Sequence, residues 1–357
     1  MTAAARTLDF TLPPDLEAHE PPEARGLARD EVRLLISRVH DDHVSHRRFR
    51  DLPDVLHEGD LLVINTSGTL PAALNATREN GTSVHVHLST HLPADLWMVE
   101  LRVPDANATL PCRDGHAGEV LNLPGGGRCT LLAPYVTDRT TLRAERPTRL
   151  WIATLHLPLA LHPYLQRHGR PIRYGYVTHD WPLSTYQTVY ATEPGSAEMP
   201  SAGRAFTPEL LVRLVTRGVH VAPLLLHTGV SSQEDHEPPY EEYYRVPERT
   251  AERVNATRRA GGRVIAVGTT VVRALESVTD TRGVTHPGEG WTRRIVTPDT
   301  GVRAVHGLLT GWHEPRASHL LMLAALANPE HLRVAYHAAL SERYLWHEFG
   351  DLHLILP

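Results

Sequence analysis

Lysine is absent from this chain of 357 residues, so all 36 of its basic residues are arginine. Without lysine, no Schiff base can form with a carbonyl substrate, and the usual anchor for pyridoxal phosphate is missing. A phosphate-binding loop of the GxxxxGK type is excluded for the same reason, because its lysine contacts the phosphates. The absence therefore removes several large classes of enzyme before any motif is considered.

Cysteine is scarce, and long apolar runs are missing. The two cysteines, Cys112 and Cys129, are too few for a disulfide scaffold, so we expect reduced thiols that serve as packing residues. No apolar run approaches the roughly 20 residues of a membrane-spanning helix, and the text MTAAARTLDFTLPPDL lacks the apolar core of a secretion signal. Both observations favour the cytoplasm. A net charge of −5 argues against strong non-specific binding to nucleic acid, leaving room only for a local arginine patch.

The spacing of apolar residues divides the chain into segments with two different sequence patterns. Residues 67–155 hold short alternating stretches such as TSVHVHLS and RLWIATLHL, broken by glycine and proline, which predict a small antiparallel sheet or barrel. In residues 1–66 and 156–357, segments with a strand pattern such as VHVAPLLLH alternate with segments with a helical pattern such as PELLVRLVTRG. This alternation is typical of an α/β domain. We therefore predict a discontinuous α/β domain with a small β domain inserted. The proline-rich residues 234–247 are predicted to be a surface excursion; whether they close over a ligand is left open.

Three further patterns favour ordinary structural roles. The stretch GGGR at 125–128 lacks the strand–GxGxxG–helix context of a dinucleotide site and predicts a hairpin turn. Histidines at zinc-like spacing occur in HDDHVSH and in HVH, but no cysteine or carboxylate cluster completes a ligand set. We therefore expect no metal at His40, His43, His46, His85 or His87.

The stretch RVIAVGTTVVRALES, residues 263–277, carries the most informative local signal. It predicts a buried strand at 264–267, a tight turn at Gly268 and a helix with Thr269 or Thr270 as its N-cap. A helix start after a buried strand offers free amides to an anionic ligand group. A plain cap without a ligand would give the same local sequence, so this stretch alone decides nothing.

Several other motifs accompany that stretch in a fixed order. They are FTLPPDLEAHEPPEARGLARDEVRLLI, FRDLPDVLHEGDLLVIN, STYQTVYATEPGSAEMPSAGRAFT, TGWHEPRASHLLML and AYHAALSERYLWHEFGDLHLIL. Together they resemble the S-adenosylmethionine:tRNA ribosyltransferase-isomerase family of queuosine biosynthesis. The resemblance covers nearly the whole chain and is thinnest over residues 67–155.

The resemblance implies a fold and a reaction. The fold is a barrel-like mixed α/β domain built from both ends of the chain, with a small antiparallel β-barrel inserted. The reaction transfers the ribosyl part of S-adenosylmethionine, the co-substrate, onto 7-aminomethyl-7-deazaguanine in tRNA. The sugar isomerises to an epoxycyclopentane, adenine and methionine leave, and no metal is used.

That chemistry requires particular groups. The sulfonium acidifies the neighbouring C5′ protons, so a base near C5′ can start the reaction, and adenine needs a proton or hydrogen-bond donor to leave. The methionine carboxylate needs an arginine or a helix start. The resemblance implies His313 and His227 as base or acid and Arg316 as a carboxylate or phosphate clamp. For the S-adenosylmethionine pocket it implies Thr269, Thr270, Arg273, Glu276, Tyr186, Gln187, Ser201, Ala202, Gly203 and Phe206.

The chain departs from the family's motifs at several positions. The family's NDTRVxPARL is NTSGTLPAAL here, its PTAGLHFT is PSAGRAFT, its HVGxGTF is HTGVSSQ, its NFHLPRST is GWHEPRAS and its YRFFSYGD is YLWHEFGD. One acidic residue, two arginines and one histidine are lost, whereas one arginine and one glutamate appear. The positions concerned are Thr66, Gly68, Ala73, Arg204, Ala205 and Glu314, while Asp351 is kept.

Three hypotheses follow. The first is the family's reaction on tRNA. The second is a reaction in specialised metabolism that uses S-adenosylmethionine on a small-molecule acceptor or cleaves it, because loss of arginines weakens the phosphate contacts that dominate affinity for tRNA. The third is a binding protein that keeps the nucleoside site without turnover. The oligomeric state stays open.

Overall fold

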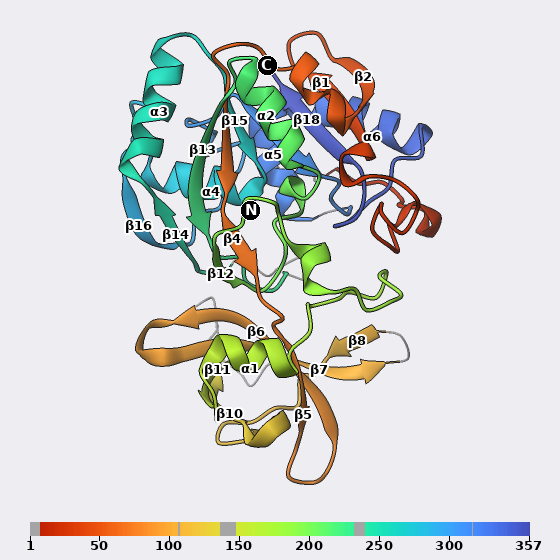
Figure 1. The fold of residues 1–357 in the computed structure, drawn as a ribbon, viewed down its shortest axis with the longest axis vertical. Helices are drawn as coiled ribbons and strands as arrows, with labels where there is room; N and C mark the ends of the chain where they lie inside the picture. Colours follow the sequence, from red (N-terminus) through yellow and green to blue (C-terminus); the bar gives the residue numbers. More distant parts are fainter. Residues whose placement is uncertain (1–7, 106–107, 136–147, 232–239, 316) are drawn as a thin grey trace.

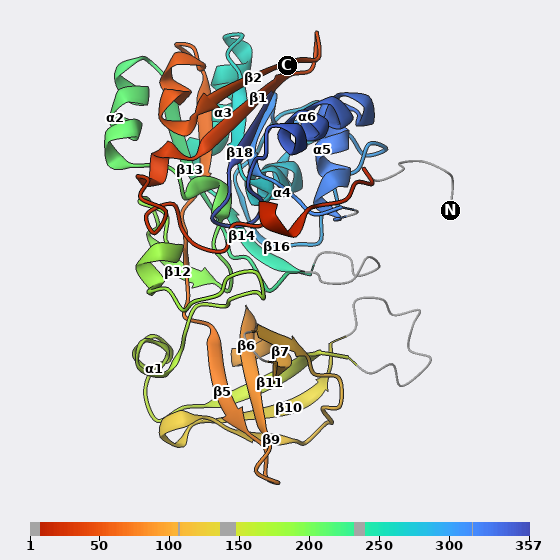
Figure 2. The same ribbon diagram turned by 90° about the vertical axis from the view of Figure 1, so that its right-hand side faces the viewer.

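The computed structural model describes residues 8–105, 108–135, 148–231, 240–315 and 317–357. The chain forms a larger body of sheet and helices and, below it, a smaller body made mainly of β-strands with the helix α1, as Figures 1 and 2 show from two sides. Among the described residues, no helix has both the length and the apolar character needed to cross a membrane.

The larger body is organised around a nine-stranded mixed sheet of order β16-β14-β13-β3-β15-β17-β18-β1-β2. The central strands β13, β3, β15 and β17 run parallel, while β14, β16, β18 and β2 each make an antiparallel pair. The strand β18 also pairs in parallel with β1, from Leu34 opposite Leu352 to Arg38 opposite Leu356. The strands are β1 Arg33–Arg38, β2 His43–Arg48, β3 Leu61–Asn65, β13 His220–Leu226, β14 Glu242–Val246, β15 Val264–Val267, β16 Gly288–Thr292, β17 Gly307–Gly311 and β18 Leu352–Leu356.

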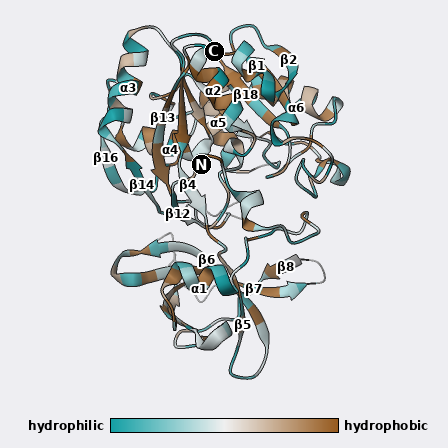
Figure 3. Cartoon of the chain, in the orientation of Figure 1, coloured by the Kyte–Doolittle hydropathy of each residue, from teal (hydrophilic) through white to brown (hydrophobic). Residues whose placement is uncertain are grey.

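Helices cover both faces of this sheet because its central strands are apolar on both sides. In β15, Val264 and Ala266 face one apolar cluster, whereas Ile265 and Val267 face another. The first cluster includes residues of α3, α4, α5 and α6; the second includes residues of α2 and of the 3-10 helix η3, Phe49–Asp54. The helices are α2 Pro208–Thr216, α3 Glu248–Arg259, α4 Thr269–Val278, α5 His319–Ala327 and α6 Pro329–Ser341. Figure 3 shows brown, apolar colour concentrated on the strands of this sheet.

The smaller body is a closed antiparallel barrel. Its strands pair in the order β11-β10-β9-β5-β6-β7, a further β11–β7 pairing closes the ring, and β8 extends from β7. A short turn at Pro124–Gly126 connects β9 to β10, so the predicted hairpin at GGGR is confirmed. The helix α1, Leu161–His168, packs on the apolar interior through Tyr164 and Leu165. The strands are β5 Ala73–Thr77, β6 Ser83–Leu92, β7 Leu96–Asp105, β8 Ala108–Pro111, β9 Val120–Asn122, β10 Arg128–Pro134 and β11 Leu150–His156.

The predicted fold class, a mixed α/β architecture with an inserted small antiparallel barrel, is confirmed. Between the two bodies, β4, Ser67–Thr69, pairs in parallel with β12, Glu193–Ser196. The predicted domain limits at 66/67 and 155/156 remain a prediction. Cys112 and Cys129 are free and buried, and burial raises the pKa of their thiols to about 11 and about 12.

The predicted surface excursion at 234–247 is wrong for its second half. Residues 232–239 lie outside the described part of the chain, but Tyr240 is buried and Glu242–Val246 form β14 inside the large sheet. The physical reason is that Tyr243, Tyr244 and Val246 are residues that favour strands, a signal which the flanking prolines obscured.

A network of buried charges fills one end of the barrel. Glu100 on β7 is fully buried; its Oε1 accepts hydrogen bonds from Arg102 and Arg149, and its Oε2 lies 3.0 Å from Nδ1 of His87. Arg149 continues out of the barrel, because its Nη2 donates to the carbonyl oxygen of Ser231 at 3.1 Å and to the Tyr240 hydroxyl at 2.7 Å. The network therefore connects the barrel interior to the segment on either side of residues 232–239.

Candidate active site

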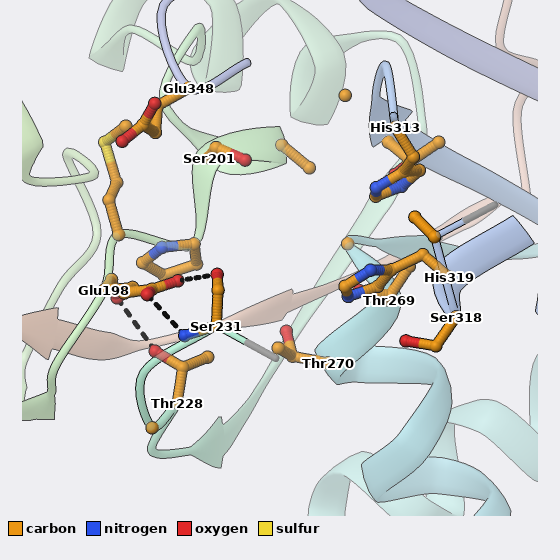
Figure 4. Close-up of a pocket in the computed structure, with 18 of the residues that line it drawn as sticks. Glu198, Ser201, Thr228, Ser231, Thr269, Thr270, His313, Ser318, His319 and Glu348 are labelled. Carbon is orange, nitrogen blue, oxygen red and sulfur yellow. Dashed lines mark hydrogen bonds between the residues drawn. The ribbon is translucent and has the colours of Figure 1, made fainter. Parts of the chain in front are cut away.

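A cavity of about 560 Å³ lies where the two bodies meet. Its walls come from loops after β12 and β13, from the start of α4, from the β17–α5 connection and from residues that precede β18. The lining residues fall within 172–176, 186, 197–202, 228–231, 240–242, 268–273, 294–296, 310–322 and 347–348, with Thr69. Figure 4 shows Glu198 and Glu348 on one side of this pocket and His313 and His319 on the opposite side.

The start of α4 forms one wall of the cavity. The strand–turn–helix prediction for residues 263–277 is confirmed, but the predicted N-cap is wrong: the cap is Gly268, and Thr269 and Thr270 are the first two helical residues. Gly268 has φ 94° and ψ 153°, a conformation that glycine alone adopts without strain, so the turn falls one residue earlier. Gly268 has no side chain to cap the helix; within the described part of the chain the amides of Thr269 and Thr270 therefore remain available to an anionic group, whereas that of Val271 donates to the carbonyl oxygen of Gly268.

Arg273 lines the same wall but is held by protein groups. Its guanidinium forms an ion pair with Glu242 and donates to the carbonyl oxygens of Tyr240, Thr292 and Arg294. Glu276, which the resemblance implied for the same pocket, is almost fully buried outside the cavity lining, where it accepts from the amides of Arg303 and Ala304 at 2.7 Å. These contacts give both side chains a clear structural role in fixing α4 against its neighbours.

Two stacked histidines face the start of α4. The rings of His313 and His319 lie 4.6 Å apart at 7°, and Nε2 of His313 is 2.9 Å from the Thr310 hydroxyl. Loss of solvation in the cavity wall lowers the pKa of His313 well below 6.5 and that of His319 to about 4. Both rings are therefore neutral at pH 7 and can accept a proton, but cannot supply one as an imidazolium.

The opposite side of the cavity is acidic. We call Glu198, Glu314 and Glu348 the carboxylate wall; all three line the cavity, and burial raises the pKa of each. For Glu198 the pKa reaches about 8, although hydrogen bonds from Ser231 act in the other direction. Within the described part of the chain, no arginine or histidine lies within 4.0 Å of the carboxylates of Glu198 or Glu348.

Glu198 is held by neutral hydrogen-bond donors. Its Oε1 accepts from the backbone amide of Ser231 at 2.6 Å and from the hydroxyl of Tyr174, and its Oε2 accepts from the Ser231 hydroxyl at 2.7 Å. Figure 4 shows the bonds to Ser231 as dashed lines. The carboxyl is therefore fixed in orientation although no positive charge neutralises it.

The family model described as "Queuosine biosynthesis protein" matches residues 5–355. The chain belongs to this family. It is 36% identical over 98% of both chains to the S-adenosylmethionine:tRNA ribosyltransferase-isomerases of Symbiobacterium thermophilum and Thermus thermophilus. The crystal structure of S-adenosylmethionine tRNA ribosyltransferase from Thermotoga maritima is similar at a TM-score of 0.52 and 28% identity, covering 98% of this chain and 99% of that one.

The structure brings together most of the site residues that the queuosine biosynthesis family resemblance implied. The residues that line the cavity are Tyr186, Ser201, Ala202, Thr269, Thr270, Arg273 and His313. Arg316 lies outside the described residues. Glu276, His227, Gln187, Gly203 and Phe206 lie outside the cavity lining.

The predicted residues outside the lining have structural contacts. His227 binds the Ser67 hydroxyl at 2.7 Å, Gln187 pairs with the backbone of Thr69, and Phe206 is buried edge-to-face against Phe49. Gly203 is buried beside the hydroxyl of Tyr190. Their assignment as catalytic or substrate-binding residues remains a prediction.

Residues in the stretches that depart from the family's motifs have different positions in the structure. Arg204, which is new in its motif, is buried and pairs with Glu23 at 2.8 Å, so it anchors the amino-terminal segment rather than reaching the cavity. Asp351 is buried and accepts from the amides of Arg33 and Leu345. Glu314, in contrast, lines the cavity.

Sequence reasoning missed several residues that line the cavity: Tyr174, Tyr176, Glu198, Ser231, Arg294, His319, His347 and Glu348. A signal for some of them existed, because Ser231, His347 and Glu348 occur in the stretches HTGVSSQ and YLWHEFGD, which depart from the family's motifs. For Arg294 no local pattern points to a site, since its position depends on distant segments.

Proposed function

We propose that this chain is an S-adenosylmethionine-dependent ribosyltransferase-isomerase that modifies 7-aminomethyl-7-deazaguanine in tRNA, working in the cytoplasm. The observation that carries the proposal is the cavity built around the uncapped start of α4, in a chain that matches the queuosine biosynthesis family over residues 5–355. S-adenosylmethionine is the co-substrate, and no metal takes part. Among the described residues, no group of three or more histidine, cysteine or acidic side chains is arranged to hold a metal ion.

The donor occupies the α4 side of the cavity. The methionine carboxylate binds the free amides at the start of α4, with Thr269 and Thr270 beside it and the guanidinium of Arg294 in the same wall. Arg273 supports this wall through Glu242 rather than by direct contact, since its donors are engaged by protein acceptors.

The neutral imidazole of His313 accepts the C5′ proton of the donor. Its Nε2 lies next to the Thr310 hydroxyl, which fixes the ring, and the stacked ring of His319 limits its movement. The low pKa of His313 assigns it the role of base and not of acid, because the imidazolium is not populated at neutral pH.

The test incubates the purified protein with S-adenosylmethionine, with and without tRNA bearing the aminomethyl base. Chromatography then measures adenine, methionine and the modified nucleoside. We expect all three with the modified tRNA, and neither adenine nor methionine without it. Adenine release that needs no tRNA would contradict the tRNA acceptor, and no consumption of S-adenosylmethionine under either condition would contradict the enzymatic function.

Variants of the two histidines sharpen the assignment. We expect His313→Gln to lower kcat by about 10²- to 10⁴-fold, the usual range for loss of a general base. His227→Gln is the matched variant, because its ring lies outside the cavity lining and binds Ser67. A loss with His227→Gln equal to that with His313→Gln would contradict the assignment of His313.

A further inference from the structure

The proposed reaction contains a proton transfer for which no residue has yet been named. The acceptor carries a primary amine, which is a cation at neutral pH because such amines have a pKa of about 10. An ammonium nitrogen has no lone pair, so it cannot form the new bond to carbon until a base removes one proton. The sulfonium of the donor is also a cation but has no N–H proton to lose. The acceptor therefore requires a base of its own, separate from the one at C5′.

The position of Glu198 meets this requirement. It lies across the cavity from His313, so the two groups can serve the two substrates separately (Figure 4). A carboxylate oxygen has two lone pairs, and Oε2 of Glu198 uses one of them for the Ser231 hydroxyl. Within the described residues, its second lone pair has no protein donor. This leaves an oriented oxygen that can accept a proton from a ligand.

The surroundings of Glu198 favour a cationic ligand. Glu348 lies on the same side of the cavity (Figure 4), and its Oε2 is buried without a hydrogen-bond partner in the described part of the chain; Glu314 also lines the cavity. Burial raises the pKa of all three carboxyls, and a positive group bound beside them would stabilise their charged forms.

Resting on the proposed function, we propose that Glu198 is a catalytic base that takes one proton from the acceptor's primary ammonium. The proton moves from the ammonium nitrogen to Oε2 of Glu198, which becomes a neutral acid. The freed lone pair of the nitrogen forms the new bond to the ribosyl carbon, while the electron pair of the broken glycosidic bond leaves with adenine. Glu314 and Glu348 attract the ammonium before transfer.

Arg149 is a positioning residue for this base. It donates to the carbonyl oxygen of Ser231, and the amide and hydroxyl of the same serine donate to Glu198. Arg149 is itself held by Glu100 inside the barrel. The inserted barrel therefore sets the position of a group in the cavity without contacting the substrate at that point.

The test compares wild type, Glu198→Gln and the matched surface variant Glu252→Gln, which exchanges an exposed carboxylate on α3. The readout is formation of the modified nucleoside on tRNA bearing the aminomethyl base, together with S-adenosylmethionine binding by calorimetry. We expect Glu198→Gln to lower kcat by about 10²- to 10⁴-fold while the donor still binds. Glu252→Gln should match wild type.

The pH profile separates a base from a structural residue. The pKa of Glu198 is about 8, raised by burial and by the charges of Glu348 and Glu100; Tyr174 and Ser231 are its hydrogen-bonding neighbours, and Glu314 lines the same cavity from the β17–α5 connection. Wild-type kcat/KM should rise to about pH 8 and then level off. In Glu198→Gln it should keep rising toward the pKa of the free ammonium, about 10, because only the deprotonated amine then reacts.

A second variant guards against a folding defect in the first. Ser231→Ala removes the hydroxyl donor to Oε2, so the rising limb of the wild-type profile should move to higher pH. Equal rates and parallel profiles for wild type and Glu198→Gln, or an unmoved limb in Ser231→Ala, would overturn the assignment while leaving the proposed function intact. If wild type forms no modified nucleoside, the proposed function fails, and this assignment fails with it.

Discussion

In the barrel, Glu100 is surrounded by Arg102, Arg149 and His87; in the cavity wall, Glu198 is surrounded by hydroxyls and one backbone amide. Burial raises the pKa of both. For Glu100, the hydrogen bond with His87 and the nearby guanidinium groups outweigh burial and lower the pKa to about 2. For Glu198, the hydrogen bonds from neutral donors do not outweigh burial, and its pKa is about 8. Two glutamates joined through Arg149 and Ser231 thus have opposite protonation states at neutral pH.

The difference shows how one chain separates a structural carboxylate from a reactive one. A carboxylate saturated by guanidinium groups is a fixed anion that holds strands together and does not take up a proton near pH 7. A carboxyl bonded only to neutral donors retains a usable proton affinity. Substitutions of Glu100 and of Glu198 can each test this comparison.

The largest effect should follow from Glu100→Gln. This change removes the carboxylate that Arg102 and Arg149 share in a fully buried site, and breaking such a network costs about 3–5 kcal/mol of unfolding free energy. Chemical denaturation at pH 7 measures it. A loss below about 1 kcal/mol would show that the network is not structural.

The two glutamates should also give opposite pH dependences of stability. The folded pKa of Glu100 lies below its usual 4.5, so its stabilisation is present above pH 4.5 and is lost as the pH falls toward 2. The folded pKa of Glu198 lies above 4.5, so its contribution is present below pH 4.5 and is lost as the pH rises toward 8.

Variants at both positions measure these dependences against wild type. The deficit of Glu100→Gln should shrink as the pH falls from 4.5 toward 2, whereas Glu198→Gln should gain stability relative to wild type between pH 4.5 and 8. Thermal unfolding at several pH values provides the data. Parallel curves for the two variants would contradict the comparison.

A smaller effect is expected from Ser231→Ala. It removes one hydrogen bond to Glu198 and keeps the backbone amide, so unfolding free energy should fall by about 1 kcal/mol. Ser341→Ala, at an exposed position at the end of α6, is the control for the substitution itself. Equal stability of the two variants in denaturant would mean that Ser231 does not hold Glu198 in solution.

The smallest effect should come from an exposed ion pair. The side chains of Asp54 and Arg217 are more than half exposed, so Asp54→Asn should change unfolding free energy by less than about 1 kcal/mol. High salt should reduce even this difference. A loss as large as that of Glu100→Gln would mean that burial does not decide the strength of these pairs.

Local signals allowed much of the fold to be predicted. The apolar run Val264–Val267, the glycine after it and the helical text that follows are continuous in sequence, so their structure follows from neighbouring residues. The barrel strands could be predicted for the same reason, because the alternation of apolar and polar residues lies within each strand. The N-cap was misplaced by one residue because a glycine at φ 94° ends the turn before the threonines.

The carboxylate wall could not be predicted, because its members come from three distant segments. Glu198 follows β12, Glu314 follows β17 and Glu348 precedes β18, and the partner of Glu198 is 33 residues away. Glu276 lies three residues after Arg273 in sequence but outside the cavity lining, because its carboxylate accepts from the amides of Arg303 and Ala304.

The position of β18 between β17 and β1 has a consequence for how the chain folds during its synthesis on the ribosome. Residues 73–156 form the barrel from contiguous chain, so it can assemble while later codons are still being translated. The nine-stranded sheet cannot join Arg33–Arg38 to its centre until Leu352–Leu356 has emerged from the ribosome, some 300 residues later. Until then, the nascent polypeptide holds an unfinished sheet edge, and a nonsense mutation near codon 350 would leave that edge exposed to aggregation and to proteases.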